Sequence, residues 1–451
     1  MAGRRGLLVQ GKRNPVREMM VDFDDAPRIF TRLLIESLGR EEACTGRIVR
    51  DFYGRLNFVT PRPEDGRFDR LREAAVQRLG AYGQPTAQLI TSLSDDETGF
   101  RDLVAERSIG VSVEGLPQLR MVDRRLAGDE WLTRPAQIAS VPSRLLFYSI
   151  KGGVGRSTAL AVAAADLATQ GLNVLALDLD LEAPGLGALL LPSENMPKYG
   201  AIDWFAAVAA GADAESLIPE LSGASPFTSS RAVVDVVPAA GRDPGAYLSK
   251  LARAYTPGSV GQRYGNLNFS RKADALIEQL ISLQRYDVVL IDARAGLHET
   301  SGGLIFGLGT RTLLFGIDTS QTFDDFGILF STFAQAFDPA LEGEDLRNAL
   351  KMVHAKAPRD EKDRRPFRER SWGIWSEHLY DDVEPAMELS RDVFVFDLND
   401  ESAPHYPLEI IGDDSYARFD PRTETFPLSV DAYKPVFGNF LAGVAVILGF
   451  A

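Results

Sequence analysis

The sequence is poor in cysteine, and this excludes several kinds of site. Cys44 is the single cysteine among 451 residues, so no disulfide can form within one chain. Zinc sites rich in cysteine and iron–sulfur clusters held by several cysteines are excluded for the same reason. We therefore expect the protein in a reducing compartment, the cytoplasm.

Long hydrophobic runs are also scarce. Near the N-terminus, basic residues surround one apolar run, residues 7–9, that is too short for the core of a secretory signal. We expect residues 1–20 to form a flexible basic tail. The C-terminal stretch 436–451 would span about 24 Å as a helix, less than the roughly 30 Å of a bilayer core. A buried terminal helix that starts near Lys434 and Pro435 is therefore favoured over membrane contact.

Positive charge is in deficit as well. Lysine and arginine total 49 against 63 aspartates and glutamates, which gives a net charge of −14. Such an acidic surface repels phosphate backbones on average, so DNA is a possible partner that the net charge does not favour. A contact with DNA would have to use the basic tail or the basic residues at 356–370. With 45% hydrophobic and 25% charged residues, the composition is otherwise that of a soluble globular protein.

The pattern of apolar residues divides the chain into two parts. Residues 21–140 mix helical stretches with short strands, which predicts a small α+β domain of unknown role. In residues 141–451, apolar runs of strand length alternate with helical patterns, which predicts an α/β domain with a mostly parallel, doubly wound sheet. The charged run at 358–370 is expected to be a solvated loop. The strands expected in this second part are 145–150, 173–178, 233–237, 286–292, 312–317, 350–353 and 393–396.

A glycine-rich turn joins the first of these strands to a helix expected at 156–169. It reads KGGVGRST from Lys151 to Thr158. Its glycines permit the positive φ angles that aim consecutive backbone N–H groups at an anion, and the helix adds its positive end. The turn therefore predicts a polyphosphate site. Its glycines are Gly152, Gly153 and Gly155.

Acidic residues follow two other expected strands. Asp178 and Asp180 come at the end of the strand at 173–178, and Asp292 ends the strand at 286–292. In open α/β sheets, ligands bind at the carboxyl ends of the strands. These carboxylates are therefore expected to face the phosphates and a Mg²⁺ ion.

The turn resembles the deviant Walker A motif, K-G-G-x-G-K-[ST], of the MinD/ParA family of P-loop ATPases. It is most similar to the variants that read KGGVGR, and the resemblance covers roughly residues 144–448. It implies that Lys151 reaches the nucleotide of a second subunit, so that ATP lies between two chains. Arg156 occupies the slot of the lysine that grips the β- and γ-phosphates. An arginine keeps the charge but is bulkier, so binding is expected to survive while turnover is in question.

The resemblance also implies a role for each site residue. Lys151, Asp180 and Arg156 are the expected catalytic residues, with Asp180 orienting the attacking water. Arg294 replaces a proline of the family pattern and is either a loop residue or a second phosphate contact. The expected metal site consists of Ser157, Asp178 and Asp292. The expected nucleotide contacts are Gly152, Gly153, Val154, Gly155, Arg156, Ser157, Thr158 and Gly296.

The function that the resemblance implies is a cytoplasmic, Mg²⁺-dependent ATPase that acts as a dimerisation switch. The homodimer would form across ATP and control or position a protein partner. We expect that partner to bind through the domain at 21–140, which lies outside the resemblance. The alternative is a nucleotide-sensing interaction module with little turnover because of Arg156.

Three other classes of related protein fit less well. A tyrosine autokinase would need a tyrosine cluster at the tail, and no tyrosine follows Tyr433. Related reductase subunits need paired cysteines, which Cys44 alone does not supply. Synthases of the dethiobiotin type stay open, because their substrate residues form no short motif.

Overall fold

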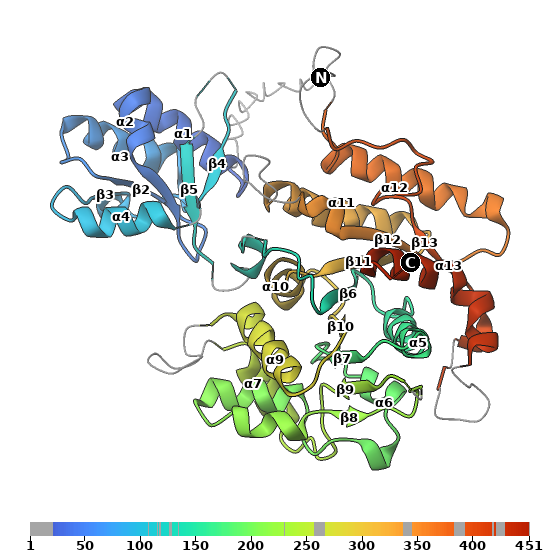
Figure 1. Ribbon diagram of the computed structural model, residues 1–451. Coiled ribbons are helices and arrows are strands. Elements are labelled where there is room, and N and C mark those ends of the chain that lie inside the picture. The colour runs from blue at the N-terminus through green and yellow to red at the C-terminus, as the bar shows by residue number, and fades with distance from the viewer. Residues whose placement is uncertain are drawn as a thin grey trace, which may run out of the picture. The chain divides into compact units, whose positions relative to one another are not determined.

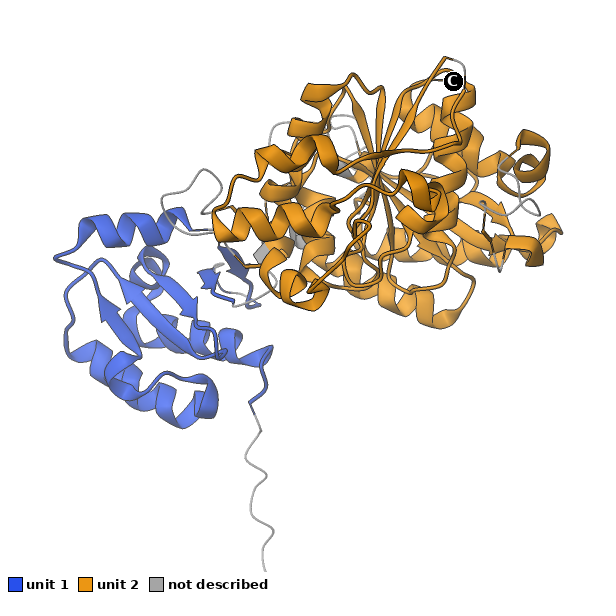
Figure 2. Cartoon of the chain, turned by 90° about the horizontal axis from the view of Figure 1, so that it is seen from below, with its two compact units in different colours: residues 1–126 blue, residues 127–451 orange. Residues whose placement is uncertain are grey.

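The structure, a computed structural model, divides the chain into two compact units, residues 1–126 and 127–451 (Figure 2). The basic tail predicted at 1–20 lies outside the described residues. The structure describes the whole chain except residues 1–20, 107, 115, 117–118, 126–128, 134, 230, 257–266, 337–344, 383–392, 417–418, 421–428 and 451.

Unit 1 is a small sheet covered by helices on both faces. Its strand order is β3-β2-β1-β5-β4. Helices α1 (Asp25–Leu38) and α3 (Gly66–Leu79) share a core with Ile48 and Phe58 on one face, and α4 (Glu97–Ala105) brings Leu103 to the other. A short helix, α2 (Arg40–Thr45), precedes the first strand. The strands are β1 (Arg47–Arg50), β2 (Leu56–Thr60), β3 (Ile90–Ser92), β4 (Ile109–Val111) and β5 (Leu119–Asp123).

Unit 2 is built on an eight-stranded sheet (Figure 1). Its order is β13-β12-β11-β6-β10-β7-β9-β8, and every pair is parallel except β8 with β9. The predicted mostly parallel α/β sheet is therefore confirmed. The strands are β6 (Ser143–Ser149), β7 (Val174–Asp178), β8 (Gly223–Ala224), β9 (Val234–Val237), β10 (Val288–Asp292), β11 (Arg311–Gly316), β12 (Leu350–Ala357) and β13 (Leu408–Ile411).

Helices cover both faces of this sheet. Alternate residues of β6 enter different cores: Leu145 and Phe147 pack with one set of helices, and Leu146 and Tyr148 with the other. This double burial explains why the strands read as continuous apolar runs. The first face carries α5 (Arg156–Thr169), α6 (Leu186–Leu190) and α13 (Val430–Leu448). The second carries α7 (Ala201–Ala210), α8 (Tyr247–Ala254), α9 (Phe269–Leu283), α10 (Glu299–Gly307), α11 (Ser320–Ala336) and α12 (Arg365–His378).

The strand order brings the predicted site residues to one edge. The central strand β6 lies between β10 and β11, and β7 lies beside β10. Asp292 at the end of β10 is paired in register with Asp178 at the end of β7. The glycine turn after β6 and both carboxylates therefore meet at the carboxyl edge of the sheet.

Two predicted segments differ from the structure. Residues 393–396 are not a strand: Phe394 and Phe396 instead pack their rings against Tyr380, and the edge strand is β13. The predicted solvated loop at 358–370 becomes helical at Arg365, because the buried Phe367 anchors the first turn of α12. At 393–396 the alternating aromatic residues form a cluster of rings. At 358–370 the buried ring of Phe367 holds part of the charged run in a helix.

The C-terminal helix is longer than expected. α13 begins at Val430, so Pro435 lies inside the helix and not at its start. Its buried side chains, such as Phe437 and Phe440, form one face against the sheet. None of the helices in the described part of the chain has the length and apolar character needed to cross a bilayer.

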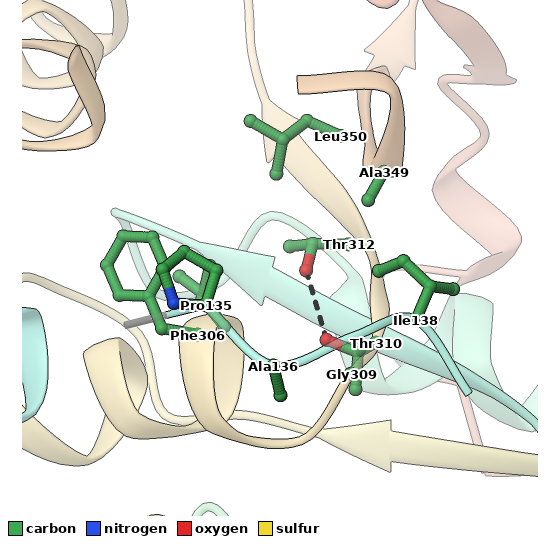
Figure 3. Close-up of a pocket in the computed structure, with 10 residues that line it drawn as sticks. Pro135, Ala136, Ile138, Phe306, Gly309, Thr310, Thr312, Ala349 and Leu350 are labelled. Atoms are coloured by element: carbon green, nitrogen blue, oxygen red, sulfur yellow. Dashed lines mark hydrogen bonds between the residues drawn. The ribbon is translucent and has the colours of Figure 1, made fainter. Parts of the chain in front are cut away.

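The boundary between the units falls before the predicted position at residue 140. Trp131, in the short helix η3 (Asp129–Leu132), packs against Gly302 of α10. Backbone N–H groups of Ala136 and Ala139 donate to carbonyls of unit 2 at 2.7 and 2.9 Å. Figure 3 shows residues of this segment and Phe306, which line a pocket at the amino-terminal edge of the sheet. The segment that connects the units thus belongs to unit 2.

Candidate functional site

The turn between β6 and α5 has the backbone of an anion-binding loop. Gly153 and Gly155 have φ of +75° and +94°, whereas Gly152 does not need a positive φ. A methyl group at any of the three would meet no atom within 4 Å, so backbone angle and not crowding favours glycine at 153 and 155. No side chain caps the first turn of α5, so no cap competes with an anion for its first N–H groups.

Arg156 does not extend freely from this loop. Its guanidinium donates to Asp292 Oδ1 at 2.5 Å through Nε and to Asp180 Oδ2 at 2.7 Å through Nη2. It also donates to Ser149 Oγ at 3.2 Å. The Arg156 side chain is 8% exposed, and both carboxylates are equally enclosed or more so. Burial lowers the pKa of Arg156, but the charges of Asp292 and Asp180 outweigh it and raise the pKa overall.

Asp178 holds the loop that follows β7. Its carboxylate accepts from the backbone N–H groups of Gly185 and Leu186 at 3.0 Å and of Asp180 at 3.2 Å. Desolvation and the nearby charge of Asp292 raise the pKa of Asp178 to about 8, against these hydrogen bonds. Both oxygens are engaged with backbone, so here Asp178 positions the loop that carries Asp180.

Lys151 is held within its own chain. Its Nζ lies 2.7 Å from Asp325 Oδ2 of α11, and the lysine side chain is 40% exposed. To reach a second subunit, as the sequence predicts, Lys151 would have to leave Asp325. The lysine end of this pair is partly exposed, but Asp325 Oδ2 is buried, so the exchange would have to give that oxygen another partner.

Gly296 has the positive φ of +93° that the loop after β10 requires. Its N–H donates to Ser149 O at 3.0 Å, and its carbonyl accepts from the Tyr148 hydroxyl at 3.1 Å. The N–H predicted to meet the γ-phosphate is therefore bound to the end of β6, and a phosphate would have to displace that bond.

Arg294 lies in the loop after β10, as one of its two predicted roles requires, and its side chain is 31% exposed. Its guanidinium pairs with Glu182 at 2.7 Å, and Glu182 also accepts from the Tyr255 hydroxyl. Glu182 follows Asp180, and Arg294 follows Asp292. The pair therefore joins the loops after β7 and β10 directly.

Two of the three predicted metal residues, Ser157 and Asp292, fit Mg²⁺ in their chemistry, whereas both oxygens of Asp178 are bound to backbone N–H groups. Ser157 Oγ lies 2.5 Å from Asp292 Oδ2, so the hydroxyl and the carboxylate are adjacent, and oxygen donors are what Mg²⁺ prefers. No three or more histidines, cysteines, aspartates or glutamates gather as a metal site within the described ranges. A metal ion would therefore depend on nucleotide phosphates for further ligands and would compete with Arg156 for Asp292.

No protein-family model and no curated protein matches the chain. Similar solved structures are ParA and MinD proteins. A pNOB8 ParA bound to nonspecific DNA is 16% identical over 68% of this chain and 97% of that one, with a TM-score of 0.40. MinD from Pyrococcus horikoshii OT3 with Mg-ADP is 19% identical over 68% and 97%, with a TM-score of 0.37. MinD from Aquifex aeolicus is 14% identical over 68% and 98%, with a TM-score of 0.40.

The predicted α/β fold, with a glycine-rich phosphate loop after the central strand, is confirmed by the topology of the chain. The central parallel strand β6, the glycine loop that follows it and the acidic ends of β7 and β10 define this fold in the chain itself. At these identities and TM-scores the solved structures carry no further conclusion about this chain.

Sequence reasoning missed the partners of the site residues. Asp325 lies on a segment with no motif of its own and Glu182 just beyond the acidic residues that follow β7, and only the folded chain brings them to Lys151 and Arg294. Lys356 is different, because it lies at the carboxyl end of β12 and the rule for open sheets could have singled it out.

Proposed function

We propose that this chain is a cytoplasmic ATP-binding switch of the MinD/ParA type that hydrolyses ATP. ATP would bind at the loop between β6 and α5, Lys151 would reach the nucleotide of a second copy, and the dimer would control or position a protein partner. The observation that carries this proposal is the meeting of the glycine loop with Arg156, Asp180 and Asp292 at one sheet edge.

In the proposed switch, the first step is a change of the partners that Arg156 binds. The guanidinium has two kinds of anionic partner available: the carboxylates it now binds, and the phosphates of a nucleotide in the loop. When it turns to the phosphates, Asp180 becomes free to orient a water molecule. Ser157 and Asp292 become free to hold Mg²⁺, which would neutralise phosphate charge. Nucleotide binding is thereby coupled to the loop after β7.

The same contacts favour a second candidate, a nucleotide-sensing module with little turnover. Arg156 is enclosed and bound by two carboxylates, and a buried guanidinium with two charge-assisted hydrogen bonds resists exchange. If the arginine stays with Asp180, the carboxylate cannot orient water. Nucleotide could then order the loops without being consumed.

One experiment separates the two candidates. ATP binding and phosphate release are measured with Mg²⁺ for the wild type and for Arg156→Lys, which places the family's usual side chain in the slot. The switch predicts binding by both proteins and measurable turnover in the wild type. The sensing module predicts binding with negligible turnover in the wild type and a clear gain in Arg156→Lys. Absence of nucleotide binding by both proteins would contradict both candidates.

The partner is proposed to bind unit 1, because none of the site residues named above belongs to that unit. DNA is not favoured by a net charge of −14. Membrane contact through α13 is disfavoured too, since the larger apolar side chains of that helix are mainly directed into the core.

A further inference from the structure

Lys356 has an unusual backbone at the end of β12. Its φ is +55°, and among the described residues it is the only one other than glycine with a positive φ. Side chains with a Cβ rarely adopt this conformation, and such residues gather at functional sites. The surrounding structure must therefore hold Lys356 in place.

A bulge between β12 and β13 provides this restraint. The register shifts between His354 and Ala357, on either side of Lys356. Ala357 O accepts from Gly412 N at 2.8 Å, and a Cβ at Gly412 would come within 3.3 Å of Lys356 O. Bulges redirect side chains, often beside active sites. Here the bulge directs Lys356 towards the glycine loop.

The side chain of Lys356 ends on the loop itself. Its Nζ donates to Gly153 O at 2.8 Å, although β11 separates β12 from β6 in the sheet. In a trans peptide, the carbonyl of Gly153 and the N–H of Val154 point in opposite directions. The bond therefore fixes the direction of the Val154 N–H on the side away from Lys356.

Lys356 also differs from the other cations of the loop. Lys151 is paired with Asp325, and Arg156 is paired with Asp180 and Asp292. In the described part of the chain, no carboxylate lies within ion-pair distance of Lys356. Among these three cations, Lys356 is thus the one whose positive charge is not paired with a carboxylate.

We propose that Lys356 is a positioning residue of the nucleotide site, which orients the loop through Gly153 O and adds positive charge on the outer side of the loop that binds the polyphosphate. This inference rests on the proposed function, because it assigns a residue to the same site. Its ligand chemistry is a nucleoside triphosphate or another polyphosphate.

The test compares three variants for their affinity for a fluorescent ATP analogue with Mg²⁺. Lys356→Gln removes the charge and keeps the length, and Lys356→Arg keeps the charge. Lys362→Gln is the matched control, because it changes the net charge equally at an exposed lysine paired with Asp360. Displacement by tripolyphosphate shows whether the effect lies on the phosphates.

We expect Lys356→Gln to bind the analogue about three- to tenfold more weakly at low salt, with a smaller loss at high salt. Lys356→Arg and Lys362→Gln should stay within about twofold of the wild type, and tripolyphosphate should lose affinity in parallel. Equal affinities of Lys356→Gln and Lys362→Gln, or an equal loss in Lys356→Arg, would overturn the inference while the proposed function stands. If the wild type binds no nucleotide, both are wrong.

Discussion

At the scale of single residues, the site is a balance of enclosed charges. One guanidinium, Arg156, faces Asp180 and Asp292, and Asp178 lies beside Asp292 in the sheet register. A third negative charge, on Asp178, would be unfavourable there. The pKa of Asp178 is therefore raised, first by burial and then by the charge of Asp292. The site is stable because Arg156 supplies the opposing charge.

Loss of Arg156 should therefore destabilise unit 2 strongly. We expect Arg156→Ala to lower the free energy of unfolding by about 3–5 kcal/mol, because two enclosed carboxylates lose their partner. Chemical denaturation measures this. Arg294→Ala, which removes an ion pair of a more exposed arginine, should cost about 1 kcal/mol or less. Equal losses in the two variants would show that Arg156 does not balance the site.

The pKa of Asp178 predicts how stability depends on pH. The value rises from an ordinary 3.8 to about 8 in the folded chain, so between these values only the folded state holds the proton. Stability should therefore fall as pH rises through this window, by up to about 1.4 kcal/mol per pH unit from this group. In Asp178→Asn this contribution disappears, and the decline of the unfolding free energy from pH 5 to 8 should be shallower. Parallel curves for the two proteins would contradict the assignment.

At the scale of elements, burial decided what could be predicted. The helix at 156–169 and the strands β6 and β10 are predictable from the sequence. Strands buried on both faces have continuous apolar sequences, and the glycine turn marks the junction between β6 and the helix. The prediction of a strand at 393–396 is wrong, because an alternation of apolar residues is also compatible with a cluster of aromatic rings.

The candidate site was predictable in part. Spacing placed Arg156, Asp180 and Asp292 at one sheet edge, where the structure has them in contact. Spacing could not reveal that Arg156 binds the carboxylates directly, since that depends on rotamer choice and enclosure. Nor could it pair Lys151 with Asp325, which is brought near by tertiary folding alone.

The connection into unit 2 is an element whose role can be tested. Glu130 of η3 is 2% exposed and accepts from Ser270 N and Asn268 Nδ2, both at 3.1 Å, at the start of α9. Glu130→Ala should lower the free energy of unfolding by about 1–3 kcal/mol, because buried donors lose their acceptor. Glu130→Gln keeps one acceptor and should lose less. Thermal unfolding compares them, and equal shifts would mean that these hydrogen bonds are not what Glu130 contributes.

At the scale of the whole molecule, dimerisation must overcome repulsion between two chains of charge −14. The proposed switch does so by bringing Lys151 of each copy to the nucleotide of the other. We expect the wild type to sediment as a dimer with ATP and Mg²⁺, and Lys151→Ala to remain a monomer. Lys362→Ala, an exposed lysine elsewhere in unit 2, should still dimerise. An unchanged ATP-dependent dimer in Lys151→Ala would exclude the lysine exchange.

The most direct test of the account is calorimetric titration of ATP into two matched glycine variants. Gly155 in the loop and Gly171 beyond the far end of α5 have φ of +94° and +92°, and an added methyl meets no atom within 4 Å at either. Alanine therefore strains both backbones alike, by about 1–2 kcal/mol. The account predicts one ATP per chain, binding about tenfold weaker in Gly155→Ala, and unchanged affinity in Gly171→Ala. No saturable binding by the wild type, or equal affinities of the two variants, would contradict it.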